Sequence, residues 1–189
     1  MFLNIVRSGY RGVLTRGRRA TVAAVSDSEQ TVHRNVQRVI DAGSALGLDV
    51  RPRRFPEGAK TAVDAANAIG CDVAQIVKSL IFAVDGEVVL AYVSGVNQLD
   101  ERKLALAAGG LECQRVDADL VREKTGFPIG GVPPIGHVST LRVFIDPDLL
   151  QHDVVWAAAG TWHDVFPLSP ADLERVSGGT VVDLKRNGA

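Results

Sequence analysis

The chain has 189 residues, of which 46% are hydrophobic and 23% are charged, and its formal net charge is −1. This length suits one domain with a substantial buried core, and the composition is that of an ordinary globular protein. No uncharged apolar run approaches the roughly 20 residues that a membrane-spanning helix needs, so we expect no membrane partner and a cytoplasmic location. Cys71 and Cys113 have no CxxC partner, and we expect both to be reduced thiols.

The first 26 residues contain five arginines and no acidic residue. The remaining residues carry sixteen basic and 22 acidic side chains, a net charge of −6. An Arg-rich, acid-free start could be a transit-like segment or an arm that binds nucleic acid. It contains no long apolar stretch and no clear cleavage site, so we interpret 1–27 as a basic, poorly ordered extension. The folded domain is expected at 28–189.

The first half of this domain should alternate helices and strands. We expect, in chain order, a helix over 32–46 closed by Gly47, an extended connection at 51–60, a short helix capped by Thr61 and stopped at Gly70, a helical turn at 71–77, and strands at 78–84 and 87–95 joined at Asp85-Gly86. Asp-Gly between two apolar runs is typical of a tight β-hairpin.

The second half repeats this mixture of elements. We expect a helix over 100–108, a short strand at 112–116, a helix at 117–126 ending at Gly126, strands at 140–146, 154–160 and 164–168, a short helix opened by Ser169-Pro170, and a closing segment at 180–184. Hairpins combined with single helices predict an α/β fold of the mixed α+β kind. The chain should form a single domain with a central mixed, mainly antiparallel sheet and helices packed around it.

The stretch TGFPIGGVPPIGH, 125–137, combines four glycines with three prolines. It cannot continue a helix or a central strand, so it must be a loop. Connecting loops are usually short and polar, whereas this one is long, stiff and apolar. Because glycines let another molecule approach the main chain closely, we interpret the loop as the wall of a binding site.

Several familiar catalytic motifs are absent from the sequence. It contains no GxxxxGK[ST], GxGxxG, GxSxG or HExxH, and no two of its four histidines stand four residues apart on an expected helix. We therefore expect no metal and no cofactor. Lys78, in QIVKSLIF, begins an apolar strand, and by itself such a lysine is usually a solvated end of a strand.

QIVKSLIF followed by TGFPIGGVPPIGH resembles the YbaK/prolyl-tRNA synthetase-associated domain family of aminoacyl-tRNA deacylases, free-standing relatives of the editing domain of bacterial prolyl-tRNA synthetases. The resemblance covers roughly 28–184 and includes VSGVNQLD, VFIDPDL and VVWAAAGTWHDVF. It implies hydrolysis, in trans, of the ester that joins a wrong amino acid to the 3′-terminal adenosine of a tRNA.

The resemblance also implies which residues form the site. Lys78 would hold the terminal phosphate or ribose and the ester through its charge. Gly131 and its neighbours would close the backbone around the aminoacyl group, supply amides for the developing oxyanion and orient a water. His137 would line the amino-acid pocket. The other substrate-binding positions implied are Ser79, Gly130, Pro134, Gly136 and Asp146, the last of which matches a family acid that could serve only to order the site.

The chain departs from its relatives at two places. The cysteine-removing branch often has glutamine where this chain has His137, which favours an alanine-, serine- or threonine-type substrate, on tRNA(Pro), over cysteine. Ala158-Ala159-Gly160 stands where some relatives have Ser-Gly-Gly, so this chain lacks the serine of that segment.

Binding of tRNA by an acidic domain requires local positive charge. The candidate basic residues are Arg51, Arg53, Arg54, Lys60, Lys78, Arg102, Lys103 and Arg142. If these residues do not share one face with the loop, tRNA binding would depend on a prolyl-tRNA synthetase as a partner. We expect the chain itself to be a monomer or weak dimer. Two other hypotheses remain open: a non-catalytic module that binds aminoacyl-tRNA, an amino acid or a nucleotide, and a purely structural domain.

Overall fold

The computed structural model describes residues 32–55, 57–58 and 61–187, and the expected basic extension at 1–27 lies outside them. Within the described residues, eight strands form two sheets. The larger sheet has the order β4–β2–β3–β5–β8, with β2 at Val77–Val84, β3 at Glu87–Ser94, β4 at Cys113–Arg115, β5 at Arg142–Ile145 and β8 at Thr180–Val181. The smaller has the order β1–β7–β6, with β1 at Arg53–Arg54, β6 at Val155–Thr161 and β7 at Asp164–Leu168.

Most strand pairs are antiparallel. β2 and β3 pair along their whole length around the Asp85-Gly86 turn, and Asp85 adopts a φ of 48° there. β5 runs parallel to β3, and β8 runs parallel to β5. The larger sheet is therefore mixed, the smaller sheet is antiparallel, and the predicted α/β fold class is confirmed. The expected central sheet is, however, divided in two.

The two sheets meet at one point. Ile76, just before β2, forms an isolated parallel bridge with Trp156 in β6. On this same edge β2 pairs with β4 only from Phe82 onward. Among the described residues, the stretch 78–81 thus has no strand partner on the edge that faces β6, and the sheets diverge there.

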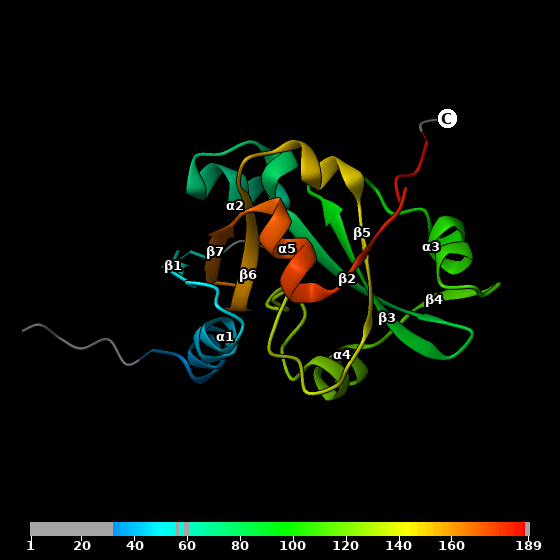
Figure 1. The fold of residues 1–189 in the computed structure, drawn as a ribbon, viewed down its shortest axis with the longest axis horizontal. Helices are drawn as coiled ribbons and strands as arrows, with labels where there is room; N and C mark the ends of the chain where they lie inside the picture. The colour runs from blue at the N-terminus through cyan, green and yellow to red at the C-terminus, as the bar shows by residue number, and fades with distance from the viewer. Residues whose placement is uncertain (1–31, 56, 59–60, 188–189) are drawn as a thin grey trace, which may run out of the picture. The chain divides into compact units, whose positions relative to one another are not determined.

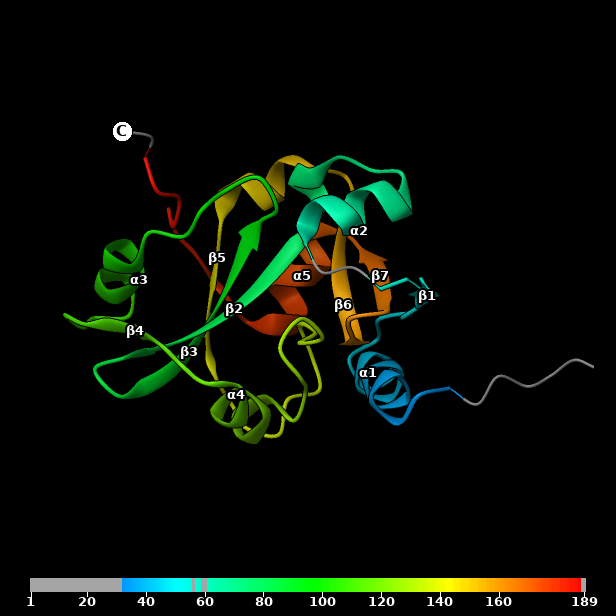
Figure 2. The same cartoon turned by 180° about the vertical axis from the view of Figure 1, so that it is seen from behind.

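In the part of the chain that the structure describes, five α-helices and two 3-10 segments connect the strands. They are α1 at Arg34–Ala45, α2 at Ala62–Ile69, η1 at Val73–Gln75, α3 at Glu101–Ala107, α4 at Ala118–Thr125, η2 at Pro147–Gln151 and α5 at Pro170–Ser177. Figures 1 and 2 show α2 at one end of the sheets, and α1 with α4 at the other. Among the described residues, no helix has the length and apolar character needed to cross a bilayer.

Local sequence signals explain the helix boundaries. Thr61 and Asp64 form a reciprocal capping box at the start of α2, so two backbone amides that the helix cannot pair are satisfied. Gly70 and Gly126 end α2 and α4 in the left-handed region, with φ of 80° and 78°. These boundaries match those predicted, whereas η2 was not predicted.

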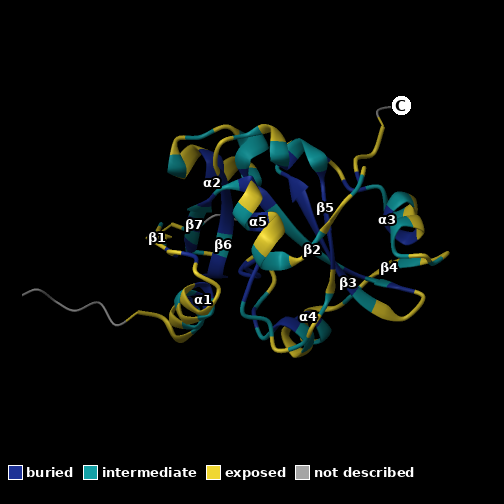
Figure 3. Ribbon diagram, viewed as in Figure 1, coloured by how far each residue is buried: buried dark blue, intermediate teal, exposed yellow. Residues whose placement is uncertain are grey.

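The larger sheet is buried on both faces. From β3, Leu90 and Tyr92 pack in the main core with Phe127 of the glycine-rich loop, while Val89 and Val93 face a second cluster around α3. Figure 3 shows this strand buried while the outward sides of the helices are exposed. Double-sided burial explains why β3 reads as a continuous apolar run rather than an alternating one.

Candidate active site

A cavity of about 520 Å³ lies where the two sheets diverge. We call it the central cavity. It is bounded by the start of β2, by β6 and β7, by the start of α2 and by the glycine-rich loop. Its lining residues are Thr61, Ala62, Val63, Ala65, Ile76, Val77, Lys78, Ser79, Leu80, Gly95, Ile129, Gly130, Val132, Trp156, Ala158, Thr161, Trp162 and Val165. The unpaired edge of β2 thus contributes to its wall.

Lys78 lines this cavity and is half-buried. Its ammonium nitrogen donates a hydrogen bond to the backbone carbonyl of Asn97, which holds the head group in place. Burial lowers the pKa of Lys78 from its ordinary value, and the negative charge of Asp146 partly offsets this by favouring the ammonium form. Lys78 is therefore a fixed, partly desolvated cation rather than a solvated strand end.

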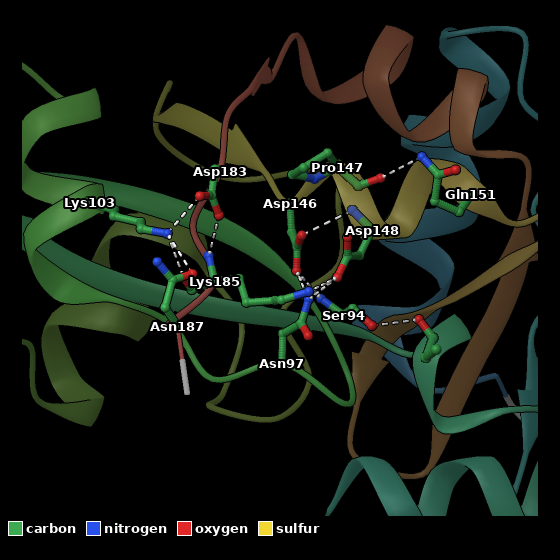
Figure 4. A network of polar contacts seen from close by, with 11 residues as sticks. Ser94, Asn97, Lys103, Asp146, Pro147, Asp148, Gln151, Asp183, Lys185 and Asn187 are labelled. Atoms are coloured by element: carbon green, nitrogen blue, oxygen red, sulfur yellow. Dashed lines mark hydrogen bonds and ion pairs between the residues drawn. The ribbon is translucent and has the colours of Figure 1, made fainter. Parts of the chain in front are cut away.

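Asp146 is almost fully buried at the end of β5. Its carboxylate accepts hydrogen bonds from the backbone amides of Ser94 (3.1 Å) and Asp148 (3.0 Å) and from the side-chain amide of Asn97 (2.7 Å). Asn97 also donates to Asp148, which forms an ion pair with Lys185 (Figure 4). Asp146 does not line the central cavity, and it reaches Lys78 through Asn97 and through its charge.

The glycine-rich loop approaches the cavity with its 129–132 segment. Gly130 lines the cavity and has a φ of 79°. The backbone amide of Gly131 donates to the carbonyl of Pro128 (3.0 Å), so this amide is engaged within the loop. The absence of a side chain at Gly131 lets the loop approach β6, because a Cβ there would lie 2.8 Å from the Cα of Thr161. The Ser79 hydroxyl donates to the carbonyl of Val132 (2.8 Å) and ties the loop to β2.

His137 and the end of the glycine-rich loop lie outside the central cavity. The Nε2 of His137 is 2.7 Å from the carbonyl of Pro133, so this nitrogen must carry the proton. Burial is the main cause that lowers the pKa of His137, and the nearby Arg38 adds to the effect. Neither His137, Pro134 nor Gly136 lines the central cavity.

Contacts of Arg38 hold the end of the loop away from the central cavity. Its guanidinium donates to the carbonyls of Thr125 (3.2 Å) and Gly136 and lies 4.5 Å from the centre of the Phe127 ring. Both ends of the loop are therefore attached to α1. Of the predicted site residues, the structure brings together Lys78, Ser79 and Gly130 and leaves the other five outside the cavity.

Some cavity residues were not identified from the sequence. Thr61 and Thr161 contribute hydroxyl groups, and Trp162 is 57% exposed at the rim. The sequence indicated only a capping role for Thr61, and Thr161 and Trp162 lie in VVWAAAGTWHDVF, a segment of the resemblance to which no site role was assigned. Asn97 lies in the VSGVNQLD segment, but nothing in the sequence indicated that its carbonyl would hold Lys78.

The predicted basic residues do not share one surface around the cavity. Lys60 and the N-terminal arginines lie outside the described residues. Ion pairs engage four of the others: Arg51 with Asp49, Arg54 with Asp164, Lys103 with Asp183, and Arg142 with Glu87. Arg53 lies over the Trp156 ring, 4.8 Å from its centre. In the described part of the chain, no group of three or more His, Cys, Asp or Glu side chains is placed to hold a metal ion.

Comparison with known proteins supports the resemblance seen in the sequence. The family model "Aminoacyl-tRNA editing domain" matches residues 56–176. A proline–tRNA ligase of Maridesulfovibrio salexigens is 35% identical over 107 residues, which is 57% of this chain but only 18% of the ligase. The uncharacterized protein YwhH of Bacillus subtilis is 29% identical over 65% of this chain and 78% of its own length.

A solved structure gives the same result in three dimensions. A candidate trans-editing enzyme for prolyl tRNA synthetase superposes with a TM-score of 0.79 at 39% identity, covering 83% of this chain and all of that one. The family-model match at 56–176 contains Lys78 and the glycine-rich loop. With the lysine at the cavity and the loop beside it, these findings show that the chain belongs to the aminoacyl-tRNA editing domain family.

Proposed function

We propose that this protein is an aminoacyl-tRNA deacylase that acts in trans, in the cytoplasm, on mischarged tRNA(Pro), with alanine as the first candidate for the wrong amino acid and serine or threonine next. The observation that carries the proposal is the position of Lys78 and Gly130 in the wall of one cavity. An open cavity of about 520 Å³ can admit a terminal adenosine with a small aminoacyl group.

The proposed reaction involves no covalent intermediate between the substrate and the protein. An aminoacyl ester is already labile, so holding it beside a water accounts for much of the rate increase. The Lys78 ammonium, fixed by the Asn97 carbonyl, would bind the terminal ribose or phosphate and draw the ester toward the loop. Because the Gly131 amide is engaged, we assign to the neighbouring Gly130 amide the contact with the developing oxyanion.

The walls of the cavity support a small amino acid. Ile76, Trp156 and Val165 are apolar, while Thr161 adds a hydroxyl whose own hydrogen bond goes to Asp164. Such a mixture suits a methyl side chain and leaves room for a short hydroxyl side chain. His137 and the other loop residues would then support the loop from behind rather than contact the substrate.

A deacylation assay tests this function. Its substrates are tRNA(Pro) charged with Ala, Ser, Thr or Cys, and Pro-tRNA(Pro) is the correctly charged control. We expect rapid loss of one small mischarged amino acid, and a decrease of about 100-fold or more in Lys78→Met, because the fixed charge acts in the transition state. Lys124→Met is the matched control: Lys124 is paired with Glu123 on α4 and does not line the cavity.

Equal activity of wild type and Lys78→Met would contradict the proposed role of the lysine. Saturable binding of aminoacyl-tRNA without loss of the ester would instead identify a non-catalytic binding module.

A further inference from the structure

A second hollow of about 540 Å³ adjoins the central cavity. We call it the arginine groove, and its lining residues are His33, Arg34, Asn35, Arg54, Arg122, Gly126, Pro128, Thr161, Trp162 and His163. Thr161 and Trp162 also line the central cavity, so the groove and the cavity adjoin at these two residues.

Three elements distant in the sequence bring positive charge to this groove. Arg34 begins α1, Arg54 lies in β1 and Arg122 lies in the last turn of α4, and all three are exposed. The described residues that line the groove include no Asp or Glu. The groove thus gathers three arginines on a chain whose net charge is slightly negative, and only Arg54 among them has a carboxylate partner in the described residues, the buried Asp164.

Arg54 is positioned for a further contact. Both of its hydrogen bonds to the buried Asp164 (3.0 and 3.3 Å) come from Nη1, while its side chain remains 52% exposed. The ion pair thus fixes the guanidinium at the groove, and the Nε and Nη2 groups can donate to another acceptor. A guanidinium held in this way is well suited to a phosphate group.

Trp162 lies where the groove meets the cavity. It is 57% exposed, and its ring packs edge-on against His163, with the ring centres 6.2 Å apart. Burial of a tryptophan ring is strongly favourable, so an exposed ring beside a positive groove marks a binding surface. The face of such a ring stacks readily on a nucleic-acid base, whatever the base.

Hydrogen bonds from α1 stabilise the shape of the arginine groove. The Asn35 side chain donates to the carbonyl of Gly160 (3.1 Å), which joins the start of α1 to the β6–β7 turn. Arg38 joins α1 to the end of α4 through the Thr125 carbonyl. These contacts fix α1 relative to β6 and α4, and β1 is held by its pairing with β7.

We propose that the arginine groove holds the single-stranded 3′ end of a tRNA, with phosphates on Arg34, Arg54 and Arg122 and a base stacked on Trp162, so that the terminal aminoacyl-adenosine enters the central cavity. This inference rests on the proposed function and names the surface through which the substrate is bound. An RNA strand accounts for both features of the groove, because phosphates need the arginines and bases need the aromatic face.

A binding assay tests the groove independently of ester hydrolysis. It measures the affinity for an uncharged tRNA(Pro) transcript by fluorescence anisotropy at several salt concentrations. We expect the double variant Arg34→Gln/Arg122→Gln to bind about tenfold or more weakly. The slope of log affinity against log salt should fall by about 1.4, since two single-strand phosphate contacts are lost. Trp162→Ala should weaken binding by a similar factor with an unchanged slope, because stacking releases no counterions.

The matched control is Arg115→Gln/Arg186→Gln. These two arginines line a different cavity, also about 520 Å³, which shares Ser79, Leu80 and Ile129 with the central cavity, so the control removes the same charge from a rival path for the RNA. Its binding should equal that of the wild type. The proposal would be overturned if the two double variants bound tRNA(Pro) equally, or if the control variant lost more affinity than the groove variant.

A transcript shortened by its three 3′-terminal nucleotides identifies the part of the RNA that is bound. The groove double and the wild type should bind this shortened RNA equally. A persisting difference would mean that the groove holds another part of the tRNA, which would also overturn the proposal. Failure of the wild type to hydrolyse any mischarged tRNA would contradict the proposed function alone, because the binding measurements still report on the groove.

Discussion

Lys78 experiences two opposing effects on its charge. Burial in the cavity wall favours the neutral amine, and the buried carboxylate of Asp146 favours the ammonium form. The groups that act on Lys78 also include the Asn97 carbonyl, to which it donates. A lysine in such a setting loses its proton at a lower pH than a solvated lysine, so the pH range of the proposed activity depends on Asp146.

Asp146→Asn should shift the alkaline limb of the pH profile. If the ammonium form of Lys78 is the active one, kcat/KM falls as the pH rises through the pKa of Lys78. Removing the charge of Asp146 lowers this pKa further, so the decline should begin at lower pH. The measurement is deacylation across alkaline pH, corrected for spontaneous hydrolysis of the ester.

Asp148→Asn provides the control for this shift. Asp148 belongs to the same hydrogen-bond network and is partly exposed, paired with Lys185 at 2.9 Å. Its replacement should leave the alkaline limb in place. A profile that does not move in Asp146→Asn would show that Asp146 only orders the site.

At the scale of elements, the position of α1 depends on Gly160. This residue has a φ of 95°, and a Cβ on it would lie 2.8 Å from the backbone carbon and oxygen of Asn35. Glycine is therefore needed both for the backbone conformation and for the close approach of α1 to the β6–β7 turn. The shape of the arginine groove follows from this contact.

Gly160→Ala should lower the free energy of unfolding by about 2 kcal/mol or more, because it adds a steric clash to the strain of a positive φ. Gly70→Ala separates the two effects. Gly70 has a φ of 80°, but a Cβ on it would meet no atom within 4 Å, so only strain of about 1 kcal/mol is expected. Denaturant unfolding measures both variants, and equal losses would show that the clash is relieved.

Elements set by local chemistry could be predicted from the sequence. Thr61 caps α2, Gly126 ends α4 and Asp85-Gly86 turns the hairpin, each through contacts within a few residues. The segment 147–151 was missed because its 3-10 conformation follows from Asp146, which caps it while also bonding Ser94 and Asn97 far away in the chain. Division of the sheet in two was missed for a similar reason, since it depends on the loss of pairing between β2 and β6 beyond the bridge of Ile76 with Trp156.

The candidate site could be predicted only in part. Lys78 and Gly130 meet in the cavity, as the resemblance implied. His137 follows the loop in sequence, but Arg38 on α1 attaches the end of the loop away from the cavity. No pattern in the sequence relates Arg34 to Arg122, because the two lie on different helices that only the tertiary structure brings to one groove.

At the scale of the whole molecule, the unit at 32–189 is expected to be sufficient for folding. The related structure that superposes over 83% of this chain is itself covered completely. We therefore expect a protein that lacks residues 1–27 to unfold at the same denaturant concentration as the full chain, and to retain deacylation. A large loss of stability would show that the extension is part of the folded domain.

The same truncation tests whether the five N-terminal arginines contact RNA. If they do, affinity for tRNA(Pro) and its salt dependence should both decrease, whereas a solvated extension would change neither. Arg34 remains in this truncated chain, so the contribution of the arginine groove can be measured separately.

The open edge of β2 also affects how the protein behaves at high concentration. Unpaired strand edges attract strands of other molecules, and a charge on the edge is a common protection against such association. Here the start of α2 and the glycine-rich loop cover the edge, and Lys78 places its ammonium group there. The lysine that we propose for catalysis should therefore also protect this edge against edge-to-edge aggregation.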